Sequence, residues 1–254
     1  MRVHSADALI LRTYRYGEAD RIVVFLTEDR GKRRGVAKNA TASRRRFGGA
    51  LEPMTRGRVT YVERENRELV RLDRIELRES PLRSTAGRPP DEAAHALGHA
   101  AYFAELVDEW APDHAADERL FRLGAAMSER LSRAGSVDAV ARYFEYWLLR
   151  LEGVYPDLDR CPHCDRSLDA GATLDDRERG FVCGACAHAG PALSPEALQF
   201  LRSLTKRRPE EVAADTTPAR VLREIEHVHR QLIALHLEKE LRSARVVSEL
   251  RPRV

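Results

Sequence analysis

Hydrophobic and polar residues alternate over the first 80 residues in short runs that are typical of β-strands. Between these runs lie turn-forming residues, as in the segment Tyr16–Asp20 and around Gly31. The alternation predicts five strands, at residues 8–14, 21–27, 33–37, 58–63 and 68–77. Five strands in so short a segment suit a small closed barrel, whereas a sandwich usually contains more strands.

Helical spacing of apolar residues replaces the alternation after a linker at residues 84–90. It predicts helices that begin at an Asp91 cap, near Asp117 and after Ser136, and two more that begin at Ser194-Pro195 and Thr217-Pro218. The expected fold class is α+β with several domains. The predicted boundaries are 1–80 for the barrel, 81–156 for the first part of a helical domain, 157–193 for an insertion and 194–254 for the C-terminal part of the helical domain.

The insertion contains all four cysteines of the chain, in two Cys-x2-Cys pairs that 18 residues separate. A two-residue gap lets both thiolates of a pair reach one tetrahedral ion, and this overall spacing is that of a four-cysteine zinc site. Disulfides are the alternative, but they are rare in the cytoplasm. We therefore expect one structural Zn²⁺ per chain, with four ligands that leave no open position for catalysis: Cys161, Cys164, Cys183 and Cys186.

Charge is distributed unevenly along the chain. Residues 1–80 contain 19 Lys/Arg and 12 Asp/Glu, although the net charge of the whole chain is only +3. Between residues 30 and 58 the only acid is Glu52. Two aromatic residues, Phe47 and Tyr61, lie in or near this stretch, and Tyr14 and Tyr16 precede it. A solvated basic loop is one interpretation. A basic, aromatic-bearing barrel that binds nucleic acid is the other, and it identifies these candidates: Lys32, Arg33, Arg34, Lys38, Arg44, Arg45, Arg46, Arg56 and Arg58.

Sequence motifs give no support to catalysis. The chain contains no P-loop, no G-x-G-x-x-G, no G-x-S-x-G and no H-E-x-x-H, and its one H-x-E follows the cysteines, unlike that of nucleobase deaminases. The expected class is a binding protein and not an enzyme. The alternatives are a zinc-ribbon protein that binds RNA or the ribosome, and a metal-dependent nuclease. No apolar run reaches the ~18 residues of a membrane span, and the N-terminus does not have the pattern of a signal peptide, so we expect a cytoplasmic protein.

Several segments of the chain match one known sequence pattern. In the N-terminal part they are residues 8–13, 16–23, 31–32, 35–38 and 46–53. In the remainder they are residues 151–156, 158–161, 193–195 and 240–243. Together these segments resemble the bacterial DNA repair protein family RecO. The resemblance covers nearly the whole chain and is loosest over residues 81–140. After Lys38 the chain departs from the family, which commonly continues with a lysine-rich stretch.

The resemblance implies an OB-type barrel, a helical domain and, in many members, a zinc-binding insertion. It also implies binding of single- and double-stranded DNA, annealing of complementary strands, and action in the RecF pathway of DNA recombination. The implied partners are RecR, often RecF, the C-terminal tail of single-strand-binding protein and, indirectly, RecA. Lys32, Arg34, Lys38 and Arg44 to Arg46 match positions where the family has basic, DNA-facing residues.

An acidic protein tail needs a basic rim around an apolar pocket. Residues 81–160 have a net charge of −5, so a basic rim there has to be local. The helical segments offer five arginines for it: Arg119, Arg122, Arg130, Arg133 and Arg142.

Overall fold

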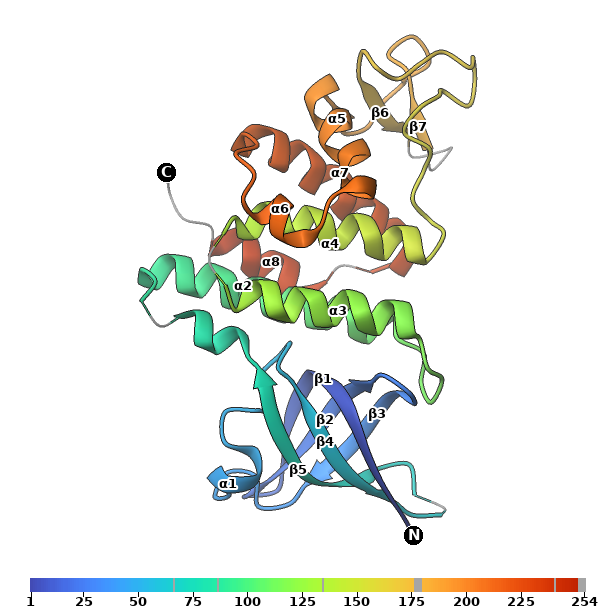
Figure 1. Cartoon of the computed structure of the whole chain (residues 1–254). Coiled ribbons are helices and arrows are strands. Elements are labelled where there is room, and N and C mark those ends of the chain that lie inside the picture. The colour runs from blue at the N-terminus through green and yellow to red at the C-terminus, as the bar shows by residue number, and fades with distance from the viewer. Residues whose placement is uncertain (66, 86, 134, 176–179, 240, 251–254) are drawn as a thin grey trace. The chain divides into compact units, whose positions relative to one another are not determined.

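The computed structural model of the chain describes residues 1–65, 67–85, 87–133, 135–175, 180–239 and 241–250. The chain forms two compact units, of which the first contains Met1–Ala134 together with Leu241–Val254 and the second contains Gly135–Glu240 (Figure 1). These units divide the chain at positions other than 80, 156 and 193, so the sequence-based domain boundaries stay predictions. No helix in the described ranges is both long enough and apolar enough to cross a membrane.

A closed five-stranded barrel with the order β1-β2-β3-β5-β4 forms the base of the first unit (Figure 1). All neighbouring strands are antiparallel except β3 and β5, which are parallel. The predicted five strands and the OB-type fold are confirmed. The strands are β1 (Arg2–Tyr16), β2 (Asp20–Thr27), β3 (Gly31–Ala37), β4 (Arg56–Glu63) and β5 (Val70–Glu79).

Alternate residues of each strand point into the barrel and fill it. Phe25 and Tyr61 are both fully buried, and their ring centroids lie 5.6 Å apart in an edge-to-face arrangement. Each buried ring or aliphatic side chain contributes roughly 1.5–3 kcal/mol to folding. The short helix α1 (Arg44–Phe47) adds Phe47 to this core. The other inward-facing residues are Ala8, Ile10, Val23, Ala37, Val59, Val70, Leu72 and Ile75.

The helices of the first unit are the 3₁₀ turn η1 (Pro81–Thr85), α2 (Pro90–Trp110), α3 (Glu118–Leu131) and α8 (Arg242–Glu249). The helix α3 begins near Asp117, as predicted, and Asp117 caps it, because its side chain accepts a hydrogen bond from the Leu120 amide. The predicted Asp91 cap of α2 is wrong. Pro89 occupies that position, and Asp91 lies in the first turn, where a carboxylate interacts favourably with the helix dipole.

The C-terminal helix α8 packs in the first unit through contacts with α2. The Glu105 carboxylate accepts hydrogen bonds from the Ser243 amide at 2.8 Å and from the Arg242 amide at 3.4 Å, so it caps the start of α8. Burial alone would raise the pKa of Glu105, but the hydrogen bonds from Ser243 and Arg242, together with Arg12, lower it. These contacts group α8 with the barrel unit, although the sequence assigns it to the second part of the helical domain.

The second unit contains α4 (Val137–Leu151), α5 (Pro195–Ser203), the 3₁₀ turn η2 (Leu204–Lys206), α6 (Pro209–Ala213) and α7 (Ala219–Leu237). Ser194 caps α5 as predicted, and α4 begins after Ser136 as predicted, with Ser136 as its cap. Thr217 does not cap α7: its hydroxyl hydrogen-bonds to Asp215, and Pro218 occupies the cap position. A small sheet of β6 (Ala172–Asp175), β7 (Gly180–Val182) and β8 (Ala192–Leu193) completes the unit.

A buried polar chain joins α4 and α7 to the segment that follows α4. Glu145 lies 2.9 Å from His229 Nδ1, and His229 Nε2 lies 2.8 Å from the Tyr155 hydroxyl. Burial lowers the pKa of His229 despite the nearby Glu145 carboxylate. Because buried polar groups that lose their partners are costly, this chain fixes the position of Tyr155 and of the segment that leads to the cysteines.

Two turn glycines give a matched test of the barrel's packing. Gly31 (φ +69°) and Gly17 (φ +66°) are both left-handed, but a Cβ on Gly31 would lie 2.0 Å from the Ala115 carbonyl oxygen, whereas one on Gly17 would meet nothing within 4 Å. We expect Gly17→Ala to lower the free energy of unfolding by about 1–2 kcal/mol, the cost of a left-handed alanine. Gly31→Ala should cost clearly more, because the 112–115 segment must also move. Urea unfolding followed by circular dichroism measures both, and equal losses would contradict the close approach at Gly31.

Candidate metal centre and nucleic-acid interface

The four cysteines lie together in the second unit, and their sulfur atoms are all within 4.8 Å of one another. The Cys164 and Cys183 sulfurs are 3.6 Å apart, far beyond the ~2.05 Å of a disulfide. Four thiolates arranged tetrahedrally at about 2.3 Å from an ion lie about 3.8 Å from each other. The cluster of Cys161, Cys164, Cys183 and Cys186 can therefore hold one metal ion.

Two tight turns present the cysteine pairs. In the first, the Asp165 amide donates to the Cys161 carbonyl at 2.9 Å, and Asp165 adopts a positive φ of 56°. In the second, the Cys186 amide donates to the Cys183 carbonyl, also at 2.9 Å. The three-stranded sheet lies between the turns, and its small core supports them: Leu168, Leu174, Phe181 and Val182. The backbone itself thus holds the two cysteine pairs in place.

The pKa values of the cysteine thiols indicate how many negatively charged thiolates the protein can stabilise without a cation. Burial alone would raise the pKa of Cys161, but backbone amides of Cys183, His163 and Cys164 outweigh it and lower the pKa to about 6. Hydrogen bonds with Cys164 and Cys183 raise the pKa of Cys186 to about 12. The protein alone therefore stabilises only part of the negative charge of four thiolates, and a cation held by the cluster would compensate the rest.

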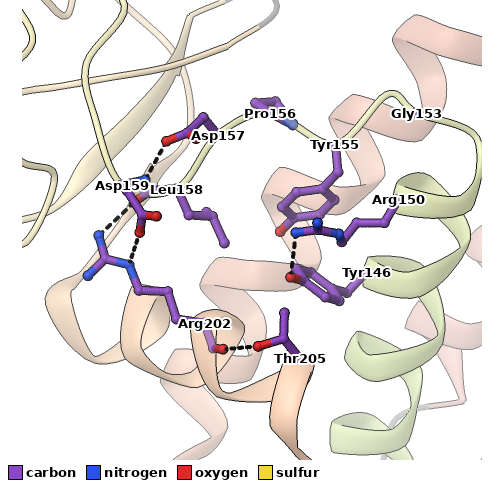
Figure 2. A pocket seen from close by; sticks show the side chains of 10 residues that line it. All are labelled: Tyr146, Arg150, Gly153, Tyr155, Pro156, Asp157, Leu158, Asp159, Arg202 and Thr205. Carbon is purple, nitrogen blue, oxygen red and sulfur yellow. Dashed lines mark hydrogen bonds and ion pairs between the residues drawn. The ribbon is translucent and has the colours of Figure 1, made fainter.

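A cavity of about 490 Å³ lies between α4, the end of α5 and the segment that leads to the first cysteine pair (Figure 2). Arg202 extends across one side of this cavity, where its Nη2 donates to the Leu158 carbonyl at 2.6 Å and its Nε lies 3.1 Å from Asp159. Arg150 donates to the Tyr146 hydroxyl at 3.1 Å on the other side. Both guanidinium groups are thus engaged within the chain. The residues around the cavity therefore connect the insertion to the helices of the second unit.

The helix α1 carries the best exposed part of the predicted basic cluster. Arg45 is exposed, and we find no ion pair for it within the described residues. Arg46 is half-buried, donates to the Lys38 carbonyl at 2.5 Å and lies over the Phe47 ring at 5.0 Å. Arg44 begins α1, but its side chain lies outside the described part of the chain. Lys38, Arg45 and Arg46 thus form one exposed group, which we call the α1 cluster.

Lys32 and Arg33 do not lie on an exposed surface, contrary to the sequence-based expectation. Lys32 is 8% exposed, donates to the Asp108 carbonyl at 2.6 Å and lies 3.6 Å from the Asp108 carboxylate. Arg33 is also 8% exposed and hydrogen-bonds to His114 Nδ1. These side chains hold the loop after α2 against the barrel. Their burial argues against contact with phosphates, because both side chains would have to leave the partners that they have within the chain.

The remaining candidates of the barrel are distributed around it. Arg34 is exposed on β3, 4.0 Å from Glu68. Arg58 is exposed on β4, but Arg56 is half-buried and lies 3.3 Å from Asp7. Because β5 separates β3 from β4, residues that are clustered in sequence do not form one patch in space.

The five predicted partner-binding arginines do not gather into one rim either. Arg119, Arg122 and Arg133 are exposed on or just after α3. Arg130 is only 8% exposed, and Arg142 is 3% exposed and lies in α4, in the second unit. Arg142 forms ion pairs with Glu145 at 2.8 Å and Glu226 at 3.3 Å. A partner can therefore reach only the three exposed side chains.

Sequence reasoning missed two cations beside the α1 cluster. Arg15 on β1 and Arg21 on β2 are directly opposite each other in the strand register, on the same face of the hairpin. Directly opposed like charges destabilise a sheet, so such a pair is more favourable when an anion lies beside it. Both residues flank the turn at residues 17–19, outside the 30–58 stretch that defined the cluster. Aligning the two predicted strands across this turn places Arg15 opposite Arg21, and this alignment could have identified the pair from the sequence.

Comparisons with known proteins agree with this architecture. The family model described as "Recombination protein O N terminal" matches residues 1–81, and "Recombination protein O C terminal" matches residues 92–245. The DNA repair protein RecO of Koribacter versatilis is 36% identical over 96% of this chain and 98% of its own length. Those of Geobacter sulfurreducens and Anaeromyxobacter dehalogenans are 36% and 35% identical, over 97% and 96% of this chain and 98% and 95% of their own lengths. The resemblance seen in the sequence is thus confirmed, and the chain belongs to the RecO family of DNA repair proteins.

Proposed function

We propose that this protein is a non-enzymatic mediator of recombinational DNA repair that binds single- and double-stranded DNA. The observation that supports this most is the exposed α1 cluster on an OB-type barrel in a chain of the RecO family. Arginine guanidinium groups suit phosphate oxygens, which they bind in pairs. Arg34 and Arg58 add positive charge on other faces of the barrel. Since DNA is its ligand, we place the protein in the cytoplasm, at the nucleoid.

Annealing in this proposal follows from neutralised charge. Two complementary strands repel each other through their phosphates, and a basic surface that holds both lowers that repulsion. No nucleotide hydrolysis and no bond cleavage are needed. With RecR, and with RecF where it is present, the protein then assists the loading of RecA onto DNA covered by single-strand-binding protein.

The metal is proposed to be one structural Zn²⁺ held by the four cysteines. Thiolate ligands at this spacing favour zinc, and four of them exclude a bound water. The ion stabilises the insertion of residues 157–193 and does not take part in DNA binding.

The tail of single-strand-binding protein is proposed to contact the exposed arginines of α3. Arg119 and Arg122 are three residues apart, so they lie on one face of the helix. An acidic tail gains from such a pair through charge complementarity.

Removing charge from the α1 cluster tests DNA binding. We expect Arg45→Gln/Arg46→Gln to lower affinity for single-stranded DNA and to flatten the dependence of log K on log salt by about 1.4, since each lost phosphate contact contributes about 0.7. The matched control is Arg71→Gln/Arg74→Gln on β5, where two exposed arginines already face Asp73 and Glu76. Fluorescence anisotropy across a salt series measures both. If the dependence of log K on log salt is the same in both variants, the α1 cluster is not part of the DNA interface.

A cysteine substitution tests the metal and its role. We expect Cys183→Ser to reduce bound zinc from about one ion per chain and to make residues 157–193 sensitive to protease, while affinity for DNA stays largely unchanged. His163→Ala is the control, because it changes a neighbour of the cluster and keeps all four thiolates. Metal analysis and limited proteolysis give the readouts. Full zinc content in Cys183→Ser would refute the four-cysteine site.

Charge reversal tests the tail contact. Arg119→Glu/Arg122→Glu should weaken binding of a synthetic acidic tail peptide severalfold, because exposed pairs contribute roughly 0.2–1 kcal/mol each and reversal adds repulsion. Arg220→Glu/Arg230→Glu on α7 is the control, with two exposed arginines of the second unit. Titration calorimetry measures the difference. An equal loss in both variants would show only a general charge effect.

A further inference from the structure

Only two Tyr, Phe or Trp side chains in the described part of the chain are exposed, and both lie on one hairpin. The chain contains seven Tyr, seven Phe and two Trp, all within the described ranges, and of these only Tyr14 and Tyr16 are exposed, at 45% and 49%. They are two residues apart on β1, so their rings leave the same face of the strand, about 6.7 Å apart along it. The other Tyr, Phe and Trp rings are buried or half-buried, so these two adjacent exposed rings form a distinct flat surface suited to stacking.

The same face connects these tyrosines to the α1 cluster. Tyr16 lies opposite Asp20 in the β1–β2 register, and the Asp20 carboxylate lies 3.4 Å from Lys38 Nζ. The Asn39 amide, and to a smaller extent Lys38, lower the pKa of Asp20, so this carboxylate is ionised and already paired. Lys38 in turn accepts the hydrogen bond from Arg46 through its carbonyl. Tyr16 is therefore connected to Lys38 through Asp20, and Lys38 is connected to Arg46 through its carbonyl.

The opposite face of the hairpin is also basic. It carries the Arg15–Arg21 pair, and Arg21 lines a cavity of about 500 Å³ between the hairpin and the loop at residues 40–53. Among the residues that line this cavity the only acid is Glu52. A polyanion that approaches the hairpin thus meets cations on both sides and aromatic rings on one.

We infer that Tyr14 and Tyr16 stack on unpaired nucleobases of a single strand whose phosphates lie along Lys38, Arg45 and Arg46. The inference rests on the proposed DNA binding and deepens it, because it makes the exposed bases, as well as the phosphates, part of what is recognised. Stacking on an aromatic ring contributes about 1–3 kcal/mol per base and is tolerant of sequence. It is confined to single strands, since the bases of a duplex stack on one another and do not present their faces.

The test compares strands that differ only in their bases. Labelled thymidine single strands of about 16 nucleotides, the upper site size of one OB fold, are compared with abasic strands of the same number of phosphates and with a duplex of the same length. We expect Tyr14→Ala/Tyr16→Ala in the full-length protein to weaken binding of the thymidine strand by tenfold or more. Binding of the abasic strand and of the duplex should stay unchanged, and so should the salt slope.

Tyr14→Phe/Tyr16→Phe is the matched variant, because it keeps both rings and removes only the hydroxyl groups, including the acceptor of the Arg12 hydrogen bond. It should bind all three ligands as the wild type does. A loss that is equal for thymidine and abasic strands, or a loss in the Phe variant, would overturn the stacking inference while leaving DNA binding by the α1 cluster in place. If the wild-type protein binds none of the three ligands, the proposed function fails together with the inference.

Discussion

The unusual length of β1 is the constraint on which the barrel and its binding surface depend. Its first half, Arg2–Leu9, pairs with β4, and its second half, Ala8–Tyr16, pairs with β2, with a register shift between Ile10 and Arg12. Because β1 pairs with both β2 and β4, the sheet has no unpaired edge strand and the barrel is closed. Beyond Leu9 the only strand that pairs with β1 is β2. The end of this hairpin, with Tyr14 and Tyr16, is exposed to solvent.

Some of the basic residues in this sequence stabilise the fold and others are available to bind an anion. The exposure of each side chain determines which of the two it does. Lys32 and Arg33 belong to the same basic stretch as Arg45, but they are buried against the loop after α2. A buried cation with a carboxylate partner fixes geometry and is unavailable to an outside anion. Arg45 has no such role within the described residues and remains available. The count of cations in a segment therefore overestimates the charge that DNA can meet.

Local features of the fold could be predicted from sequence, whereas features set by distant contacts could not. Alternation of apolar residues predicted all five strands, and Ser194 predicted the cap of α5, because both signals act within a few residues. The position of α8 depends on Glu105, which lies 138 residues before Ser243, and no local pattern encodes that contact. The strands β6 to β8 are only two to four residues long, too short for a periodic signal. The cysteine spacing predicted the cluster because two short turns determine it.

An annealing protein has to hold a single strand without keeping its bases from a complementary strand. Phosphate contacts meet this need, since they do not occupy the bases, but they bind any polyanion equally and weaken with salt. Stacking adds preference for unpaired bases at roughly 1–3 kcal/mol each, and stacking within duplex DNA contributes on average about 1.4 kcal/mol per base-pair step. Two rings can therefore retain two bases of a free strand, and formation of a few base-pair steps offsets their loss. A surface with only two exposed rings, Tyr14 and Tyr16, beside a salt-sensitive cationic cluster is thus strong enough to select single strands and weak enough to release them as duplex.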